Sequence, residues 1–494
     1  NRTNTLWSAH RLSSFYTRVT YDYMKKYFLA ATMRRDGSSR FGSGRKWGNF
    51  PSISGGWAIG KEPFMASLES ITNFKFRAGY AITGNERIGD FSSLSLYSPG
   101  YFYSDKSGIA ISQLANPDLG WEETAQQNYG IDLEILKGRI KFSLDRYIKK
   151  TTDLLYNVNL PSESGFTQQT RNVGSVENKG WDITLNAVVL RKNNFKWSSN
   201  FNISFNKNKI IKLANPNGFE TGAYFIQEGQ PIGNIYGYKR NGVFKYDESN
   251  AFTDAGVQLT PEFDNSGSFS GYSLNGQRYE DTVNRLKYAG VQLQGGDIIW
   301  EDIPNKEGVR DFSINEKDRS VIGNGLPKFY GGFTNRFVYK NLSLSLLVNY
   351  KFGHDIYREY DEYRDKGGNI NNTPSPDAIN QAWQHPGDDA NYPRLSFRQN
   401  QNQLKYESTY VSQGDFIRLQ NINLTYNMPR EILKKTNMFK SLSFSATVNN
   451  AITFTNYSGY NADLRSRNPL QPGWDDLLGY PNKVELIIGL RAQF

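Results

Sequence analysis

Apolar and polar residues alternate along most of the chain, a pattern that is typical of β-strands rather than helices. In the segment LSLSLLVNYKF, every second residue from Leu344 to Phe352 is apolar or aromatic, and mostly polar residues lie between them. In the segment DFIRLQNINLTYNM, the phase of the alternation slips between Leu419 and Ile422. Because one extra residue shifts the phase of a strand, this slip predicts a β-bulge.

About thirteen segments carry the strand pattern. Many of them contain ten or more residues, which is long for a soluble sheet and suits a strand tilted across a membrane. The predicted strands are 14–24, 27–37, 51–60, 71–83, 123–137, 139–157, 176–192, 197–210, 327–340, 342–357, 415–428, 441–455 and 483–494.

The connections between these strands alternate between short and long, which is the layout of an outer-membrane β-barrel with short periplasmic turns and long extracellular loops. A soluble sandwich has no reason to sort its loops by length, and no repeat of propeller length is visible. The short connections are 25–26, 61–70, 137–138, 192–194, Asn341 and 429–440. The long connections are 38–50, 84–122, 158–175, 211–326, 358–414 and 456–482.

The strand count predicts that part of the barrel lies upstream. Bacterial barrels have an even number of strands, and both of their ends lie on the periplasmic side. With the last strand running inward, an odd count places the first strand at the extracellular rim. We therefore expect residues 1–494 to be the C-terminal part of a larger all-β transmembrane barrel.

The composition agrees with a membrane barrel and excludes other classes. Aromatic residues make up 14 % of the chain, yet the mean hydropathy is negative, as a barrel with one apolar face requires. No run of 18 apolar residues predicts a transmembrane helix. The net charge of +10 comes from Lys and Arg residues that are scattered rather than clustered, so we expect no nucleic-acid partner. Cysteine is absent, which excludes thiolate metal sites.

Seven segments, in order along nearly the whole chain, resemble the SusC-like family of TonB-dependent transporters from the outer membrane of Bacteroidota. The first, RRDGSSRFGSGRKWGNFPSISGGW, is similar to a family hallmark that joins two strands over an extracellular loop. The other segments are FKFRAGYAITGN (74–85), NPDLGWEET (116–124), NVGSVENKGWDI (172–183), EGQPIGNIYGYKRNGVF (228–244), DRSVIGNGLPKFYGGFTNRF (318–337) and GDFIRLQNINLTYNMP (414–429).

The resemblance implies a barrel of about 22 strands with an N-terminal plug in its lumen. The plug and the first strands would not be in this chain. The resemblance also implies that the protein takes up oligosaccharides or oligopeptides as nutrients. The TonB complex would power this uptake through the missing N-terminal part. A SusD-like surface lipoprotein would cover the extracellular mouth, and outer-membrane lipid and lipopolysaccharide would surround the wall. The alternative is a passive porin, a structural barrel or a surface receptor without active transport.

Substrate contacts are expected from aromatic and polar side chains in the two last long loops, because aromatic faces stack on sugar rings or peptide side chains. The alternative is that these aromatic residues form the interfacial girdle or pack the loops against the lipoprotein. The candidates are Tyr357, Tyr360, Tyr363, Trp383, Tyr392, Arg394, Tyr460, Trp474, Asp475 and Asp476.

Two further features have structural interpretations. The terminal Phe494 resembles the aromatic end that outer-membrane proteins present to the barrel-assembly machinery, or it is simply the last apolar residue of a strand. The glycine-rich segment 34–48 lacks the ending of a phosphate-binding loop and does not lead into a helix. We interpret it as a structured loop in which Arg34, Arg35 and Asp36 form a charge network at the rim.

No enzymatic, metal or cofactor site is expected. Family members often carry a calcium-like loop in the region 296–323, but here Lys306 and Arg310 interrupt the ligand pattern, so a solvated extracellular loop is the prediction. The three histidines are far apart in the sequence, and no nucleophile elbow or zinc-protease motif is present.

Overall fold

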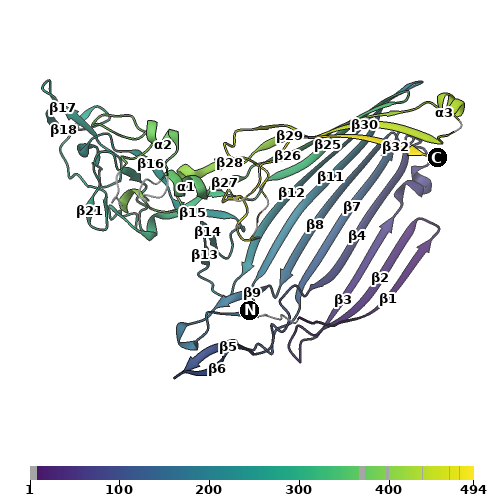
Figure 1. Ribbon diagram of the computed structural model, residues 1–494, viewed down its shortest axis with the longest axis horizontal. Helices are drawn as coiled ribbons and strands as arrows, with labels where there is room; N and C mark the ends of the chain where they lie inside the picture. The colour runs from purple at the N-terminus through teal and green to yellow at the C-terminus, as the bar shows by residue number, and fades with distance from the viewer. Residues whose placement is uncertain are drawn as a thin grey trace.

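Thirteen antiparallel strands form one curved sheet and follow the order of the chain, with β1 and β32 at the two edges (Figure 1). The structure is a computed structural model that describes residues 8–365, 373–395, 400–436, 438–464, 466, 468–477 and 479–494. The strands of this sheet are β1 (Leu12–Tyr23), β2 (Tyr27–Ser38), β3 (Trp47–Trp57), β4 (Ile71–Asn85), β7 (Glu122–Ile135), β8 (Ile140–Thr152), β11 (Ser175–Lys192), β12 (Phe195–Lys212), β25 (Phe329–Tyr339), β26 (Leu342–Phe352), β29 (Phe416–Asn427), β30 (Ser441–Thr455) and β32 (Glu485–Gln493).

All thirteen predicted strands are present in this sheet, which confirms the predicted all-β fold class. The alternation gives each strand an outward apolar face, so that Val19 and Ile488 are 64 % and 80 % exposed. The opposite face carries polar networks. In one of them, Arg77 lies 2.6 Å from Asp132 and 2.9 Å from Asp145 on neighbouring strands.

The β-bulge predicted in β29 is confirmed. The pairing of β29 with both of its neighbours shifts between Leu419 and Asn421. Relative to β26, Gln420 is the extra residue, and the alternation resumes in the opposite phase beyond it. On the other side, the extra residue belongs to β30, where Asn450 and Ala451 lie opposite Gln420.

Two predicted strands end earlier than expected, in each case at a residue with a positive φ. The segment 139–157 breaks at Asp153, whose φ is 54°, and the segment 342–357 breaks at Gly353, whose φ is 76°. A left-handed residue interrupts the pleat of a strand. The chain then enters short loop strands instead of extending the wall.

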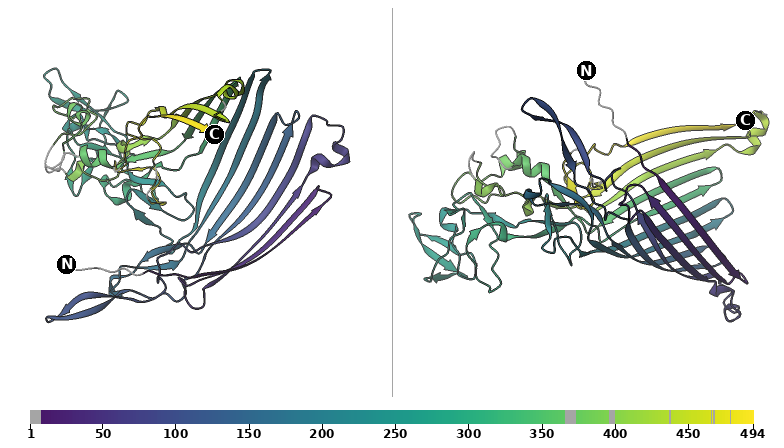
Figure 2. Two further views of the ribbon diagram at one scale, coloured as in Figure 1. Left: turned by 45° about the vertical axis from the view of Figure 1, so that its right-hand side comes forward. Right: turned by 90° about the horizontal axis from the view of Figure 1, so that it is seen from below.

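The connections follow the predicted alternation with one exception. The loop expected at 38–50 spans only residues 39–46, because β3 already begins at Trp47 and pairs with the last residues of β2. The other long connections gather at one end of the sheet, and the short ones lie at the other (Figures 1 and 2).

The long connections contain small sheets and two short helices, and the short connection 429–440 contains a third helix. Among the described residues, no helix is both long and apolar enough to cross a bilayer. The loop strands are β5 (Leu96–Tyr103), β6 (Lys106–Gln113), β9 (Leu155–Asn159), β10 (Gln168–Asn172), β13 (Phe219–Thr221), β14 (Tyr224–Ile226), β15 (Asn234–Tyr238), β16 (Arg240–Val243), β17 (Thr260–Phe263), β18 (Phe269–Leu274), β19 (Gln277–Tyr279), β20 (Lys287–Tyr288), β21 (Val291–Gln292), β22 (Ile298–Trp300), β23 (Ser313–Ile314), β24 (Arg319–Asn324), β27 (Asp355–Arg358), β28 (Val411–Gln413) and β31 (Trp474–Asp475). The helices are α1 (Glu359–Asp365), α2 (Pro376–Asn380) and α3 (Arg430–Thr436).

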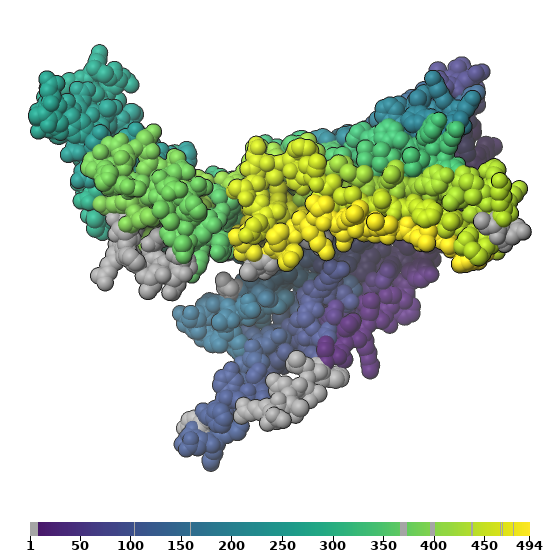
Figure 3. Space-filling model, turned by 45° about the horizontal axis from the view of Figure 1, so that its top comes forward, coloured from purple at the N-terminus to yellow at the C-terminus, as the bar shows by residue number. Residues whose placement is uncertain are grey.

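Residues 240–318 form a folded unit that projects beyond the end of the sheet (Figure 3), and its hydrophobic core also includes Tyr238 and Leu404. Trp300 and Leu286 are almost completely buried in this core. The prediction of a solvated loop at 296–323 is therefore wrong for residues 296–302, whereas residues 304–309 are exposed as expected. The many charged residues in that segment suggested exposure, but its short apolar run forms the buried strand β22.

Candidate functional site

A cavity of about 730 Å³ lies between the upper ends of β29 and β30 and the segment 460–482. Four predicted contact residues line it: Tyr460, Trp474, Asp475 and Asp476. The other lining residues are Arg418, Gln420, Asn450, Asn461, Asp463, Leu464, Ser466, Asn468, Gln471, Leu477, Gly479, Tyr480 and Asn482.

Arg418 organises the side of the cavity that belongs to the barrel wall. Its guanidinium donates hydrogen bonds to Thr453 Oγ1 at 3.0 Å and to Asn461 Oδ1 at 2.7 Å. Asp463 lies 3.6 Å from Arg418 and accepts a hydrogen bond from Lys351 Nζ at 2.7 Å. These contacts fix the loop to the wall, and they neutralise the carboxylate of Asp463.

The bulged Gln420 extends the same wall with amide groups. Gln420 Nε2 donates to Asn450 Oδ1 at 2.8 Å, and Asn450 Nδ2 donates to the backbone oxygen of Lys483 at 3.1 Å. Each amide of this kind combines donors with an acceptor, so the pair retains capacity to bind a polar ligand.

The opposite side of the cavity is held by β31, which pairs with β27 in parallel. Trp474 packs against the fully buried Tyr357, with ring centroids 5.5 Å apart. Asp475 accepts hydrogen bonds from the hydroxyl of Tyr457 and from Leu477 N. Burial and the neighbouring Asp475 carboxylate raise the pKa of Tyr457, so Tyr457 remains a neutral donor.

Two tyrosines present their rings to solvent at the cavity. Tyr460 is 66 % exposed and Tyr480 is 89 % exposed. Because Asp463 and Asp475 are engaged by neighbouring groups, the surface offered to a ligand consists mainly of amide groups and aromatic faces. Such a surface suits binding of a polar ligand by stacking and hydrogen bonds.

The remaining predicted contact residues lie outside the lining of this cavity. Tyr360 and Tyr363 are 43 % and 58 % exposed on α1. Trp383 and Arg394 instead join the unit 240–318, since Trp383 Nε1 donates to Lys245 O at 3.1 Å. Arg394 lies 3.0 Å from the carboxylate of Asp297.

Tyr392 belongs to the same junction, because its backbone oxygen accepts a hydrogen bond from Trp383 N at 2.9 Å. Phe494 is 70 % exposed at the end of the chain, and its ring lies 5.0 Å from that of Phe439. Its role in barrel assembly stays a prediction.

The wall residues Arg418, Gln420 and Asn450 line the cavity but were not among the contacts predicted from the loops. The signal that could have found Gln420 is the phase slip, because a bulge re-aims side chains at functional sites. Tyr480 lies in the same loop as Trp474, but nothing in its local sequence distinguishes it from other loop tyrosines.

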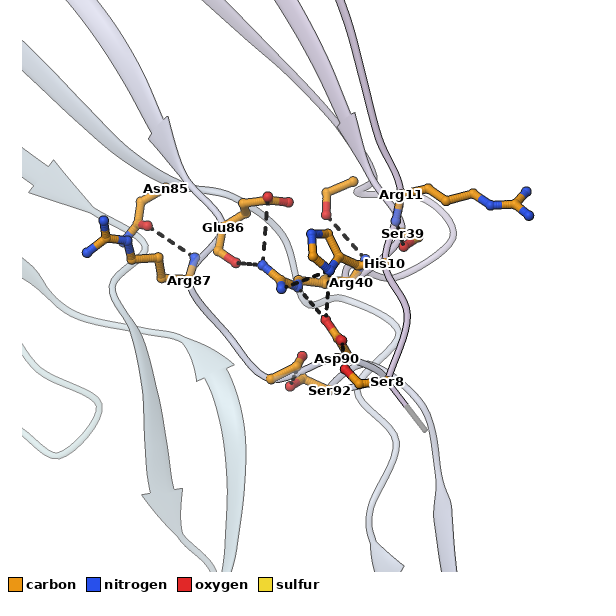
Figure 4. A network of polar contacts seen from close by, with 12 residues as sticks. Ser8, His10, Arg11, Ser39, Arg40, Asn85, Glu86, Arg87, Asp90 and Ser92 are labelled. Carbon is orange, nitrogen blue, oxygen red and sulfur yellow. Dashed lines mark hydrogen bonds and ion pairs between the residues drawn. The ribbon is translucent and has the colours of Figure 1, made fainter. Parts of the chain in front are cut away.

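A second polar cluster at the loop end of the sheet ties the first described residues to two loops (Figure 4). Arg40 Nε lies 2.8 Å from Asp90, and its guanidinium lies 3.7 Å from Glu86. Ser8 donates a hydrogen bond to Asp90, and His10 lies 3.5 Å from the same carboxylate. These donors lower the pKa of Asp90, Ser8 having the largest effect and Arg40 the next. These contacts hold the two loops and the chain near Ser8 together.

The predicted charge network at the rim forms only in part. Arg34 Nε lies 2.8 Å from Asp36, as expected. Arg35 does not join this pair, because consecutive residues of a strand point to opposite faces. Its guanidinium instead lies 5.3 Å from the ring centroid of Trp47.

The segment that resembles a calcium loop has a buried acidic centre. The carboxylate of Asp302 is buried and makes no hydrogen bond within the described residues. Burial, together with Asp318 and Asp311, raises the pKa of Asp302 to about 6. Within the part of the chain that the structure describes, no group of three or more His, Cys, Asp or Glu residues is arranged to hold a metal ion.

Comparisons with known proteins identify relatives along the whole chain. The sequence profile described as "TonB dependent receptor-like, beta-barrel" matches residues 1–224. The TonB-dependent receptor P39 of Formosa agariphila is 53 % identical over all of this chain and 47 % of its own length. The TonB-dependent receptor SusC of Bacteroides thetaiotaomicron is 28 % identical over 99 % of this chain and 44 % of its own length.

The chain therefore spans about half the length of the curated relatives it matches. Among solved structures, that of the RagAB peptide transporter superimposes with a TM-score of 0.78 and 22 % identity. The match covers 98 % of this chain and 48 % of the transporter chain, and it shows that the fold is shared.

Proposed function

We propose that this chain, which belongs to the SusC-like family of TonB-dependent receptors, is the C-terminal part of an outer-membrane importer. The importer takes up oligosaccharides or oligopeptides, and TonB supplies the energy. A SusD-like lipoprotein acts as its lid. The relatives are receptors and transporters rather than enzymes.

The observation that carries this proposal is the cavity between the wall and the segment 460–482. Its amides and exposed tyrosine rings can bind a hydroxyl-rich or amide-rich chain. It is built from the barrel wall and a long loop together, so a ligand held there lies at the entrance of the lumen.

The proposed orientation places the long loops outside the cell and the end of β32 in the periplasm. The clustering of the long connections at one end of the sheet supports it. The two unpaired edges β1 and β32 support the proposal that further strands complete the barrel, because an open edge is not stable in lipid.

Replacing Tyr460 and Tyr480 with alanine tests the proposed site. Two stacking faces lost from one site should raise the half-saturating ligand concentration for uptake by about tenfold. Uptake of labelled oligosaccharides and oligopeptides is measured in cells that carry the full-length protein. Tyr97→Ala removes an exposed tyrosine from the hairpin β5–β6, outside the cavity, and is the matched control.

A second experiment separates active transport from a passive porin or a surface receptor. Uptake through an importer stops when TonB is deleted, whereas diffusion through a porin continues. A receptor binds ligand without TonB and supports no uptake in either strain. Continued uptake without TonB, or the absence of uptake with TonB, would contradict the proposed function.

A further inference from the structure

Two arginines on the outward face of the sheet stack on tryptophans. The guanidinium of Arg35 lies 5.3 Å from the ring centroid of Trp47, and that of Arg146 lies 4.8 Å from the ring centroid of Trp181. The two pairs occupy different parts of the wall, on β2–β3 and on β8–β11. The same arrangement therefore occurs twice.

Alternation along the strands places Arg146 on the face that meets lipid. Its neighbour Asp145 points inward, where it pairs with Arg77. Arg146 must point outward, because successive side chains lie on opposite faces. In the register of the sheet it lies between Tyr129 and Trp181, which are 45 % and 40 % exposed.

Arg35 lies on the outward face for the same reason. Arg34 and Asp36 pair with each other on the inward face, and Arg35 lies between them. Its partner Trp47 also stacks on the exposed Phe15, with ring centroids 6.1 Å apart.

Both pairs belong to a band of aromatic residues towards the loop end of the sheet. Trp181 pairs in register with Phe205, which pairs with Phe329, which pairs with Phe352. The last two rings are stacked with centroids 5.3 Å apart. Bands of this kind mark the boundary between the hydrocarbon and the headgroups of a membrane.

A second aromatic band near the short turns gives the height of the apolar wall. Tyr23, Tyr27 and Trp57 form a stack there. The strand from Phe15 to Tyr23 is about 27 Å long, or about 20 Å across the bilayer at the usual tilt. This is close to the apolar height of outer-membrane barrels, about 25 Å. Arg35 therefore lies near the headgroup level of one leaflet.

Neither arginine has an anionic partner in the described part of the chain. Each guanidinium stacks on a tryptophan ring, whereas the inward Arg77 is held between two carboxylates. An uncompensated charge at the edge of the hydrocarbon is unfavourable. A guanidinium is planar, stacks on aromatic rings and binds phosphate with two parallel hydrogen bonds. The missing partner is therefore an anionic group supplied by the membrane.

We propose that Arg35–Trp47 and Arg146–Trp181 bind phosphate groups on the headgroups of outer-leaflet lipids. The tryptophan fixes the plane of each guanidinium, and the guanidinium supplies the charge. Four strand spacings separate β2 from β8, about 19 Å in all, so each pair engages a separate phosphate. This lipid site goes beyond the proposed transport function, and its assignment to the outer leaflet rests on the proposed orientation of the barrel.

The test measures lipid binding to the full-length protein, purified in mild detergent and stripped of lipid. Bisphosphorylated lipid A is added, and the bound lipid is counted by native mass spectrometry. Each arginine replaced by glutamine should weaken binding at its site by about tenfold. Lipid A without phosphate groups should bind weakly to the unmodified protein and equally weakly to R35Q/R146Q.

Two further variants separate this site from general surface charge. Arg191→Gln removes an exposed arginine from the short-turn end of β11, and it should leave lipid A binding unchanged. Replacing Trp47 and Trp181 with leucine keeps both arginines but should weaken binding, because the guanidinium planes are no longer fixed.

Equal binding of lipid A to R35Q/R146Q and to the unmodified protein would overturn the proposal. A similar loss in Arg191→Gln would also overturn it, since the effect would then be one of net charge. Heat-resistant migration of the folded barrel in gels confirms that each variant has assembled. TonB-dependent uptake is measured on the same variants, so failure of the lipid site and failure of the transport function are distinguishable.

Discussion

The buried carboxylate of Asp302 makes the stability of the unit 240–318 depend on pH. Its carboxylate is buried beside Asp318 and Asp311, and its pKa is raised from the usual 3.8 to about 6. The folded unit therefore holds this proton more tightly than the unfolded chain does. The unit should lose stability as the pH rises from about 4 to about 6, and should stay at the lower level above that range.

Asp302→Asn removes the buried charge and should stabilise the unit at pH 7.5 by at most about 3 kcal/mol. Below about pH 4 the variant should match the unmodified protein, because Asp302 is then protonated in both folded and unfolded states. The measurement is hydrogen exchange of β22 in the full-length protein at both pH values, corrected for the intrinsic rates. Glu307→Gln, an exposed change in the same segment, is the control. Faster exchange in Asp302→Asn at pH 7.5 would show that the ionised carboxylate is needed.

At the scale of one element, β29 combines a regular strand with one inserted residue. Gln420 places an amide in the cavity, and the strand keeps its apolar residues outward on both sides of the bulge. A deletion at the bulge therefore leaves the faces in phase. A deletion in a regular strand moves every later side chain to the opposite face.

Deleting Gln420 should preserve assembly of the barrel, whereas deleting Leu346 from the regular strand β26 should prevent it. The amount of heat-resistant barrel in the outer membrane measures both outcomes. The protein without Gln420 should also bind ligand more weakly, because the amide pair with Asn450 is lost. Equal assembly of the two deletion variants would contradict the register argument.

On the scale of the whole molecule, the unit 240–318 is an insertion into a hairpin of the loop region. Tyr238 at the end of β15 pairs directly with Arg319 at the start of β24. The first and last residues of the unit are therefore adjacent in space, next to the pair Tyr238 and Arg319. The segment that carries Trp383 and Arg394 packs on the unit rather than on the wall.

Replacing residues 239–318 with an Asn-Gly turn should leave the thirteen-stranded sheet able to assemble, because such a turn closes an antiparallel hairpin. The segment 383–394 should then become sensitive to proteases, since its partners Lys245 and Asp297 are removed. Limited proteolysis of the assembled full-length variant measures this. Continued protection of 383–394 would show that the wall or another loop holds it.

Much of the fold could be predicted because strand formation and facing are local properties. A period of two residues fixes which side chains point outward. Loop length indicates which end of the sheet carries the long connections and which carries the short turns. The bulge at Gln420 was visible as a break in that period. Strand ends at Asp153 and Gly353 were not, because a left-handed residue leaves no mark on the alternation.

Local patterns along the chain were enough to predict the wall: thirteen strands, their apolar faces and the family to which they belong. The cavity and the outward Arg–Trp pairs became visible only in the folded protein. Arg418 meets Asp463, and Trp474 meets Tyr357, across long stretches of chain. Loop residues have no periodic pattern that specifies such partners. Their contacts are set by which loops the curved wall brings together, and this is a property of the whole sheet.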